Sequence, residues 1–148
     1  MQKTKQNRGF TLLEMMLVLA LLGVVAGLSL PVYQKFQTRN DLDIAANTAA
    51  FALRRAQVNA RGSLLDDAWS VHFQNSKISI YEGATFSQGA TLYATYSVPS
   101  TIQWSGLADV SYAKFSGYPV STGSVNLRSI TNEQRSVSIN AKGTLTLQ

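Results

Sequence analysis

With 148 residues, the chain has room for one membrane-inserted segment and one small domain. Its composition, 45% hydrophobic and 14% charged, excludes an intrinsically disordered chain. The formal charge of +5 includes Lys3, Lys5 and Arg8. After residue 9, 10 basic residues face 8 acidic ones, so the charge is weak evidence for nucleic-acid binding. The sequence has no cysteine, which excludes disulfides and thiolate chemistry.

Two N-terminal segments differ in composition. Residues 1–9 are polar and basic, whereas residues 10–30 form an apolar run of 21 residues that is interrupted mainly by Thr11, Glu14 and Ser29. A helix of about 20 apolar residues crosses the hydrocarbon core of a bilayer, and basic flanks stay in the cytoplasm. The sequence therefore predicts a single pass through the cytoplasmic (inner) membrane by residues 10–30, with the rest of the chain outside the cytoplasm.

Three interpretations of this segment compete: a secretory signal peptide, a plain single-span anchor and a helix used for filament assembly. Glu14 distinguishes them, because a carboxylate at mid-bilayer costs about 2.5–3.5 kcal/mol and neither of the first two gains from it. In a filament, Glu14 can pair with the N-terminal amine of a neighbouring subunit. Removing one partner of such a buried pair typically costs about 3–5 kcal/mol. Glu14 therefore favours the filament interpretation.

The sequence around this carboxylate is Gly9-Phe10-Thr11-Leu12-Leu13-Glu14, between a short basic leader and the apolar run. It resembles the N-terminal signal of type IV pilins and type II secretion pseudopilins. The resemblance implies that a prepilin peptidase/N-methyltransferase removes the leader, residues 1–9, by cutting between Gly9 and Phe10, and then methylates the amine of Phe10. It also implies that Glu14 acts in subunit assembly and that Pro31 is the helix-kinking proline found in many members.

The helical pattern continues beyond the apolar run. Residues 31–61 carry a stripe spaced by three and four residues, which predicts an amphipathic helix; its members are Leu42, Ala45, Ala49, Leu53, Ala56 and Ala60. Asn40 or Asp41 is a candidate cap for a helix restarted after the kink, and Gly62 is the expected stop. The basic residues of this half are expected on a solvated face, with contact to neighbouring subunits or a polyanion as the alternative; they are Lys35, Arg39, Arg54, Arg55 and Arg61.

Residues 62–148 change to short β-like runs. Eight are separated by turn signals, and many alternate apolar and polar residues: 69–73, 77–81, 91–98, 102–104, 110–115, 125–128, 137–140 and 144–147. The last two predict a hairpin. The fold expected is α+β and pilin-like: a long N-terminal helical spine, transmembrane in its first half, packed on an antiparallel β-sheet head.

A second, softer resemblance lies in this half. Short patterns near Arg54-Arg55, in the strand beginning at Trp69, around Phe115-Ser116-Gly117 and in the last hairpin are similar to the GspH/FimT-like group of minor pseudopilins and minor pilins. This resemblance implies a low-copy subunit near the filament tip that helps to initiate assembly.

The chain lacks a recognisable catalytic constellation, and we expect no enzyme activity, cofactor or metal. His72, the only histidine, is expected to be structural. Asp66 and Asp67 suit a turn better than a calcium loop, because no ligand-rich sequence surrounds them. The aromatic residues of the head are expected to pack rather than to stack on bases.

The sequence therefore predicts a structural subunit of a type IV pilus or type II secretion pseudopilus, minor and near the tip. Its expected partners are the prepilin peptidase, other pilin or pseudopilin subunits, the inner-membrane assembly platform and the lipid bilayer, and it ends in an extracellular or periplasmic filament. Two alternatives stay open: the major subunit, and a DNA-capturing minor pilin. The chain lacks the basic C-terminal tail of some DNA-binding relatives, so the DNA alternative rests on a patch of Arg128, Arg135 and Lys142.

Overall fold

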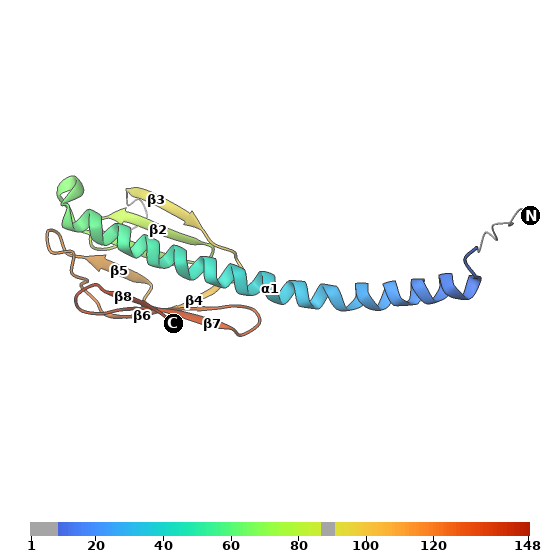
Figure 1. The fold of residues 1–148 in the computed structure, drawn as a ribbon. Coiled ribbons are helices and arrows are strands. Elements are labelled where there is room, and N and C mark those ends of the chain that lie inside the picture. Colours follow the sequence, from blue (N-terminus) through green and yellow to red (C-terminus); the bar gives the residue numbers. More distant parts are fainter. Residues whose placement is uncertain (1–8, 87–90) are drawn as a thin grey trace, which may run out of the picture. The chain divides into compact units, whose positions relative to one another are not determined.

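The computed structural model describes residues 9–86 and 91–148. It begins with helix α1 (Leu12–Arg61) and a short 3-10 helix, η1 (Leu64–Asp66), as Figure 1 shows. The strands that follow are β1 (Trp69–Gln74), β2 (Lys77–Glu82), β3 (Leu92–Ser97), β4 (Gln103–Gly106), β5 (Asp109–Tyr112), β6 (Gly123–Arg128), β7 (Gln134–Ile139) and β8 (Leu145–Leu147). The chain divides into two units after Phe36, and the second unit, Gln37–Gln148, contains the later part of α1 and all eight strands.

Helix α1 is continuous through Pro31, as the pattern predicted, and the kink itself stays a prediction. The expected restart at Asn40 or Asp41 is wrong, because both residues lie inside the helix and no new N-terminus needs a cap there. The helix ends at Arg61, next to the predicted stop. The left-handed backbone that turns the chain belongs to Ser63 (φ 48°) rather than to Gly62.

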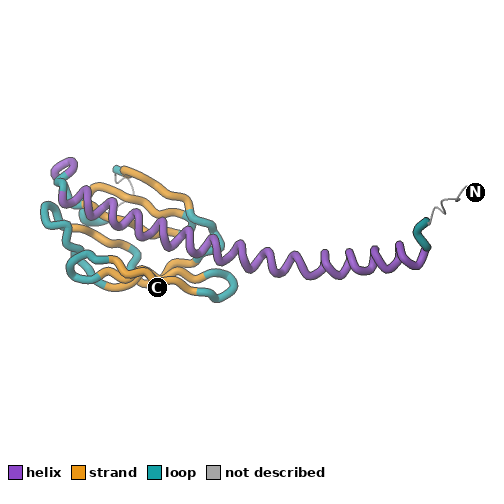
Figure 2. Tube along the Cα trace, in the orientation of Figure 1, coloured by secondary structure: helices purple, strands orange, loops and turns teal. Residues whose placement is uncertain are grey.

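The eight predicted strands are present with shifted ends, and all pairings are antiparallel. They divide between two four-stranded sheets rather than forming one: β3-β2-β1-β5 and β4-β6-β7-β8 (Figure 2). The predicted C-terminal hairpin is confirmed, with Ser138 opposite Thr146. The fifth strand is shorter than predicted, since β5 ends at Tyr112 and Phe115 takes a left-handed turn conformation (φ 65°).

The core lies between the second half of α1 and both sheets. Helix residues Ala45, Ala49 and Ala56 are fully or almost fully buried, and their small side chains let the strands approach the helix closely. Alternate residues of the strands complete the core, including Trp69 on β1 and Val137 on β7. The α+β class predicted from the sequence, a long helix packed on antiparallel strands, is confirmed.

Candidate functional site

The start of α1 holds the residues that the sequence singled out. Thr11 precedes the first helical residue, and its hydroxyl Oγ1 accepts a hydrogen bond from the backbone N–H of Glu14 (3.2 Å). Glu14 is thus the third residue of the helix, where its carboxylate lies near free N–H groups and the positive end of the helix dipole. Thr11 and Glu14 have the spacing of a capping box, a Thr-x-x-Glu signal present in the sequence that we had not predicted as a cap.

The apolar segment that follows is exposed along its described side chains. Phe10 and Leu12 are each 79% exposed, and none of the most apolar stretch of α1 is buried. In the described residues, α1 is the one helix long and apolar enough to cross a membrane, with a mean hydropathy of 2.4 over its most apolar stretch. Such a surface requires lipid or other helices to cover it, which fits anchoring in the inner membrane.

The structure describes some of the predicted site residues fully and others only in part. Gly9 and Phe10 are exposed and begin the described part. Residues 1–8 of the predicted leader lie outside it. Pro31 lies inside α1, and its side chain is outside the described residues. Cleavage after Gly9, methylation of Phe10 and the assembly role of Glu14 therefore stay predictions.

The basic residues of α1 lie on a solvated face as predicted, apart from the half-buried Arg55; the exposed ones are Lys35, Arg39, Arg54 and Arg61. Arg39 pairs with Glu133 (3.1 Å), and Arg135, from the patch on which the DNA alternative rests, pairs with Asp43 on α1 (Nε–Oδ1 2.8 Å). Arg128 donates to the side-chain oxygen of Asn132 (2.8 Å). The ion pair with Asp43 offsets the charge of Arg135, whereas the bond from Arg128 to a neutral amide leaves its charge available to a polyanion.

The residues considered for chemistry have structural partners. His72 Nδ1 lies 2.7 Å from Asp109 Oδ1, and its ring stacks on Phe86, with ring centroids 4.0 Å apart. Asp66 pairs with Lys114 (2.5 Å) at the turn after α1. Among residues 9–86 and 91–148, no three His, Cys, Asp or Glu side chains lie close enough together to hold a metal ion.

The aromatic residues of the head divide between core and surface. Tyr112 is fully buried, in line with the packing role predicted for these residues. Phe115 and Tyr118, however, are 70% and 54% exposed. The packing prediction therefore holds for only part of the group.

Comparison with known proteins gives a family match at the N-terminus and pilin relatives that match over short stretches. The family described as "Prokaryotic N-terminal methylation motif" matches residues 4–30. The fimbrial protein EcpC of Eikenella corrodens is 43% identical over 43 residues, which are 29% of this chain and 28% of that protein. The type IV major pilin protein PilA of Myxococcus xanthus is 44% identical over 52 residues, 35% of this chain and 23% of that protein. The match thus spans about a quarter of each of these relatives.

A solved structure shares the fold of most of the chain. The minor pseudopilin EpsH from the type 2 secretion system of Vibrio cholerae shares the fold with a TM-score of 0.55 and 14% sequence identity, over 73% of this chain and 96% of that chain. The chain thus resembles type IV pilins and pseudopilins in two respects: it carries the N-terminal methylation motif with pilin-like sequence, and it shares the fold of a pseudopilin.

Proposed function

We propose that the chain is a minor pilin or pseudopilin that helps to initiate assembly of a type IV pilus or type II secretion pseudopilus near its tip. The observation that carries this proposal is the likeness of its fold to that of a minor pseudopilin over 96% of that chain. By contrast, the match to the major pilin PilA covers only 23% of that protein. The first match spans most of this chain and the second only 35% of it, which supports the proposal of a minor role.

Processing supplies the charge that assembly uses. Cleavage after Gly9 creates a positive amine on Phe10, four residues before Glu14 along the chain. Gly9 suits the cleavage position because, without a Cβ, it lets a second protein approach the backbone closely. The cap from Thr11 fixes the first turn of α1, and the Glu14 carboxylate is exposed at that turn. The carboxylate can then pair with the amine of a neighbouring subunit once the helices bundle.

During assembly, the exposed apolar segment, residues 10–30, passes from lipid to a bundle of helices. Before assembly the segment lies in the inner membrane with the head outside the cytoplasm. In the filament, helices of other subunits replace lipid around it. Entry into the bundle selects subunits whose Glu14 carboxylate is paired, because an unpaired carboxylate is costly in an apolar bundle, whereas a paired one is tolerated.

Position on the filament tests this proposal. The sequence has no cysteine, so Thr122→Cys, at an exposed position of the head, gives a single site for maleimide-linked gold. We expect sparse gold at one filament end in the native host, and fewer filaments of normal length after deletion of the chain. Gold distributed along the shaft would show a major subunit instead.

A further inference from the structure

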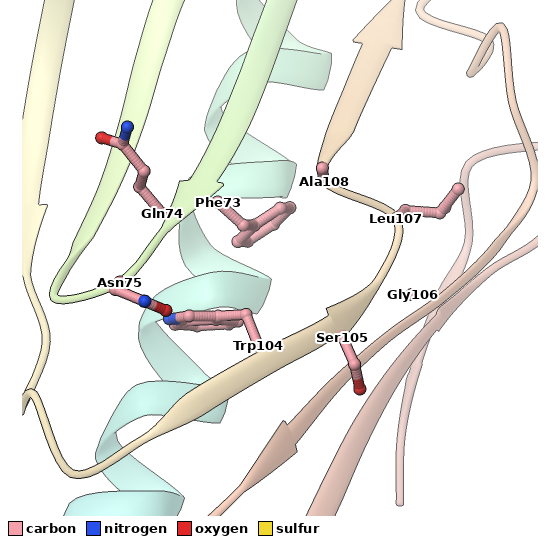
Figure 3. A pocket seen from close by; sticks show the side chains of 8 residues that line it. All are labelled: Phe73, Gln74, Asn75, Trp104, Ser105, Gly106, Leu107 and Ala108. Atoms are coloured by element: carbon pink, nitrogen blue, oxygen red, sulfur yellow. The ribbon is translucent and has the colours of Figure 1, made fainter.

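A small cavity lies in the head where the two sheets meet. It has a volume of about 280 Å³, and Figure 3 shows the side chains around it. The rings of Phe73 on β1 and Trp104 on β4 form an aromatic wall, with centroids 5.3 Å apart and planes inclined by 34°. Gln74, Asn75 and Ser105 also line it, although the Gln74 amide and the Ser105 hydroxyl are directed away from the two rings, and the lining contains no charged residue (Figure 3).

One donor beside this cavity has no acceptor. The indole Nε1–H of Trp104 is buried, and no hydrogen-bond partner is found for it in the described residues. Buried indoles normally find a partner, and Trp69 does: its Nε1 donates to the carbonyl of Leu64 (2.9 Å). A buried donor left unpaired costs about 1–3 kcal/mol. Trp104 therefore favours a ligand that brings an acceptor such as a carbonyl.

The cavity also adjoins an open strand edge. Strand β4 is the outer strand of its sheet and pairs only with β6. On the facing sheet, the pairing of β1 with β5 ends at His72, and the amide of Phe73 makes the next bond, to the carbonyl of Ala108 (2.8 Å). Beyond Phe73, the end of β1 and the free edge of β4 face each other across the cavity (Figure 3).

Strand β4 has one of the features that protect an edge, its short length of four residues, but it lacks the chemical ones. Its sequence, Gln-Trp-Ser-Gly, contains no lysine, proline or other charged residue. Natural proteins use such residues, bulges or covering segments to stop a free edge from pairing with another chain. An uncharged edge beside an aromatic cavity combines the two elements of strand addition: main-chain hydrogen bonds and a pocket for a side chain.

We propose that this cavity and the free edge of β4 bind an extended, uncharged segment of another protein, which adds to β4 as a further strand. A carbonyl of the segment accepts from Trp104 Nε1, and one apolar side chain lies against Phe73 and Trp104. The volume supports this occupant, because typical small-molecule sites enclose about 300–1,000 Å³ and this cavity is at or below the lower limit. The uncharged lining excludes a partner held there by ion pairs.

A tethered peptide tests the proposal on the full chain in detergent. Gln103→Cys, at an exposed position that begins β4, gives a unique attachment point. The probe is acetyl-Thr-Val-Thr-Val-Thr on a flexible linker, which raises its effective concentration to about millimolar. We expect hydrogen exchange of at least one β4 amide to slow by about tenfold, with a change in Trp104 emission.

Two controls isolate strand pairing. The same peptide with N-methylated amides cannot complete the ladder, and the peptide tethered at Ser116→Cys is attached in a different loop of the head. Neither is expected to slow exchange in β4. Equal exchange of the β4 amides with the normal and the N-methylated peptide overturns the proposal. A change in Trp104 emission on addition of free cellobiose, with no effect of the tethered peptide, also overturns it and assigns the cavity to a saccharide.

The Trp104→Phe variant tests the unpaired donor. It retains an aromatic ring and removes the N–H, so we expect the protection of β4 by the tethered peptide to fall by roughly threefold to tenfold, the range for one hydrogen bond. Unchanged protection contradicts the role of the indole. The comparison of the two peptides uses native Trp104, so it decides the proposal even where this variant folds poorly.

Discussion

The guanidinium of Arg55 on α1 donates a hydrogen bond to the hydroxyl of Tyr96 on β3 (3.0 Å). It also lies over the ring of Tyr93, 5.1 Å from the ring centroid. The hydroxyls of Tyr93 and Tyr96 raise the pKa of Arg55, so the group stays charged. Because β3 is the outer strand of its sheet, these contacts join an edge strand directly to the helix.

We expect Arg55→Lys to destabilise the head by about 1 kcal/mol, because a lysine ammonium cannot keep both the contact over the Tyr93 ring and the hydrogen bond to Tyr96 in the fixed geometry of a guanidinium. Urea unfolding of the full chain in detergent measures this change. Arg54→Lys is the matched control, since Arg54 is exposed on the same helix turn. Equal stability of the two variants would show that the Arg55 contacts contribute nothing.

Gly106 is required at the end of β4 for two reasons. Its φ is +91°, and a Cβ there would collide with the carbonyl oxygen of Ser124. Gly83 also has a positive φ (+107°), but nothing lies within 4 Å of the position of its Cβ. We expect Gly83→Ala to cost about 1–2 kcal/mol from backbone strain alone. Gly106→Ala should cost about 1–3 kcal/mol more, because the clash forces the backbone to shift.

Thermal or urea unfolding of both glycine variants gives the comparison. A loss of stability at Gly106 no greater than at Gly83 would contradict the close approach of β4 to β6.

Alkaline pH should destabilise the head through its buried tyrosines. Burial raises the pKa of Tyr81 from 10.0 to about 12, and burial also raises the pKa of Tyr112. Between pH 10 and 12 the unfolded tyrosine has released its proton while folded Tyr81 keeps it, so the unfolded state binds fewer protons and stability falls as pH rises. The slope is at most about 1.4 kcal/mol per pH unit for each group.

Tyr81→Phe should therefore reduce the loss of stability between pH 9 and pH 11, as measured by urea unfolding at the two pH values. Tyr118→Phe removes a hydroxyl that is on the surface, because Tyr118 is 54% exposed, and should leave the loss unchanged. The same pH dependence in the Tyr81 variant and the native chain would be inconsistent with a raised pKa.

Glu14→Ala should leave cleavage intact but reduce incorporation into filaments, because the peptidase acts at Gly9 whereas Glu14 acts when the helices bundle. Gly9→Val should block cleavage. Immunoblots of membranes report the size of the processed chain, and blots of sheared filaments report incorporation. Normal incorporation of Glu14→Ala would remove the pairing mechanism.

The sequence predicted the helix and strands well because their signals are local. The alanine stripe of residues 31–61 has a helical period, and the runs beginning at Trp69 and Lys77 have the period of a half-buried strand. A helix followed by such strands predicts the α+β class of the fold. The division of the strands between two sheets depends on pairings distant in sequence, such as β1 with β5, which no local pattern specifies.

Local patterns also missed residues whose role depends on a distant partner. Arg55 was assigned to a solvated face because its tyrosine partners are about 40 residues away in sequence. The left-handed turn at Ser63 carries no such signal, since glycine at 62 was the expected residue for that conformation. The cap by Thr11 was predictable, because Thr-x-x-Glu before an apolar run is a known start signal.

Quantitative mass spectrometry of sheared, purified filaments from the native host tests the central claim most directly, by counting this chain against the most abundant subunit. The account predicts a trace amount of the chain, with an N-terminal peptide that begins at methylated Phe10. A dominant amount would make the chain the building block of the shaft and contradict the minor role. An N-terminal peptide that retains residues 1–9 would contradict the processing on which assembly depends.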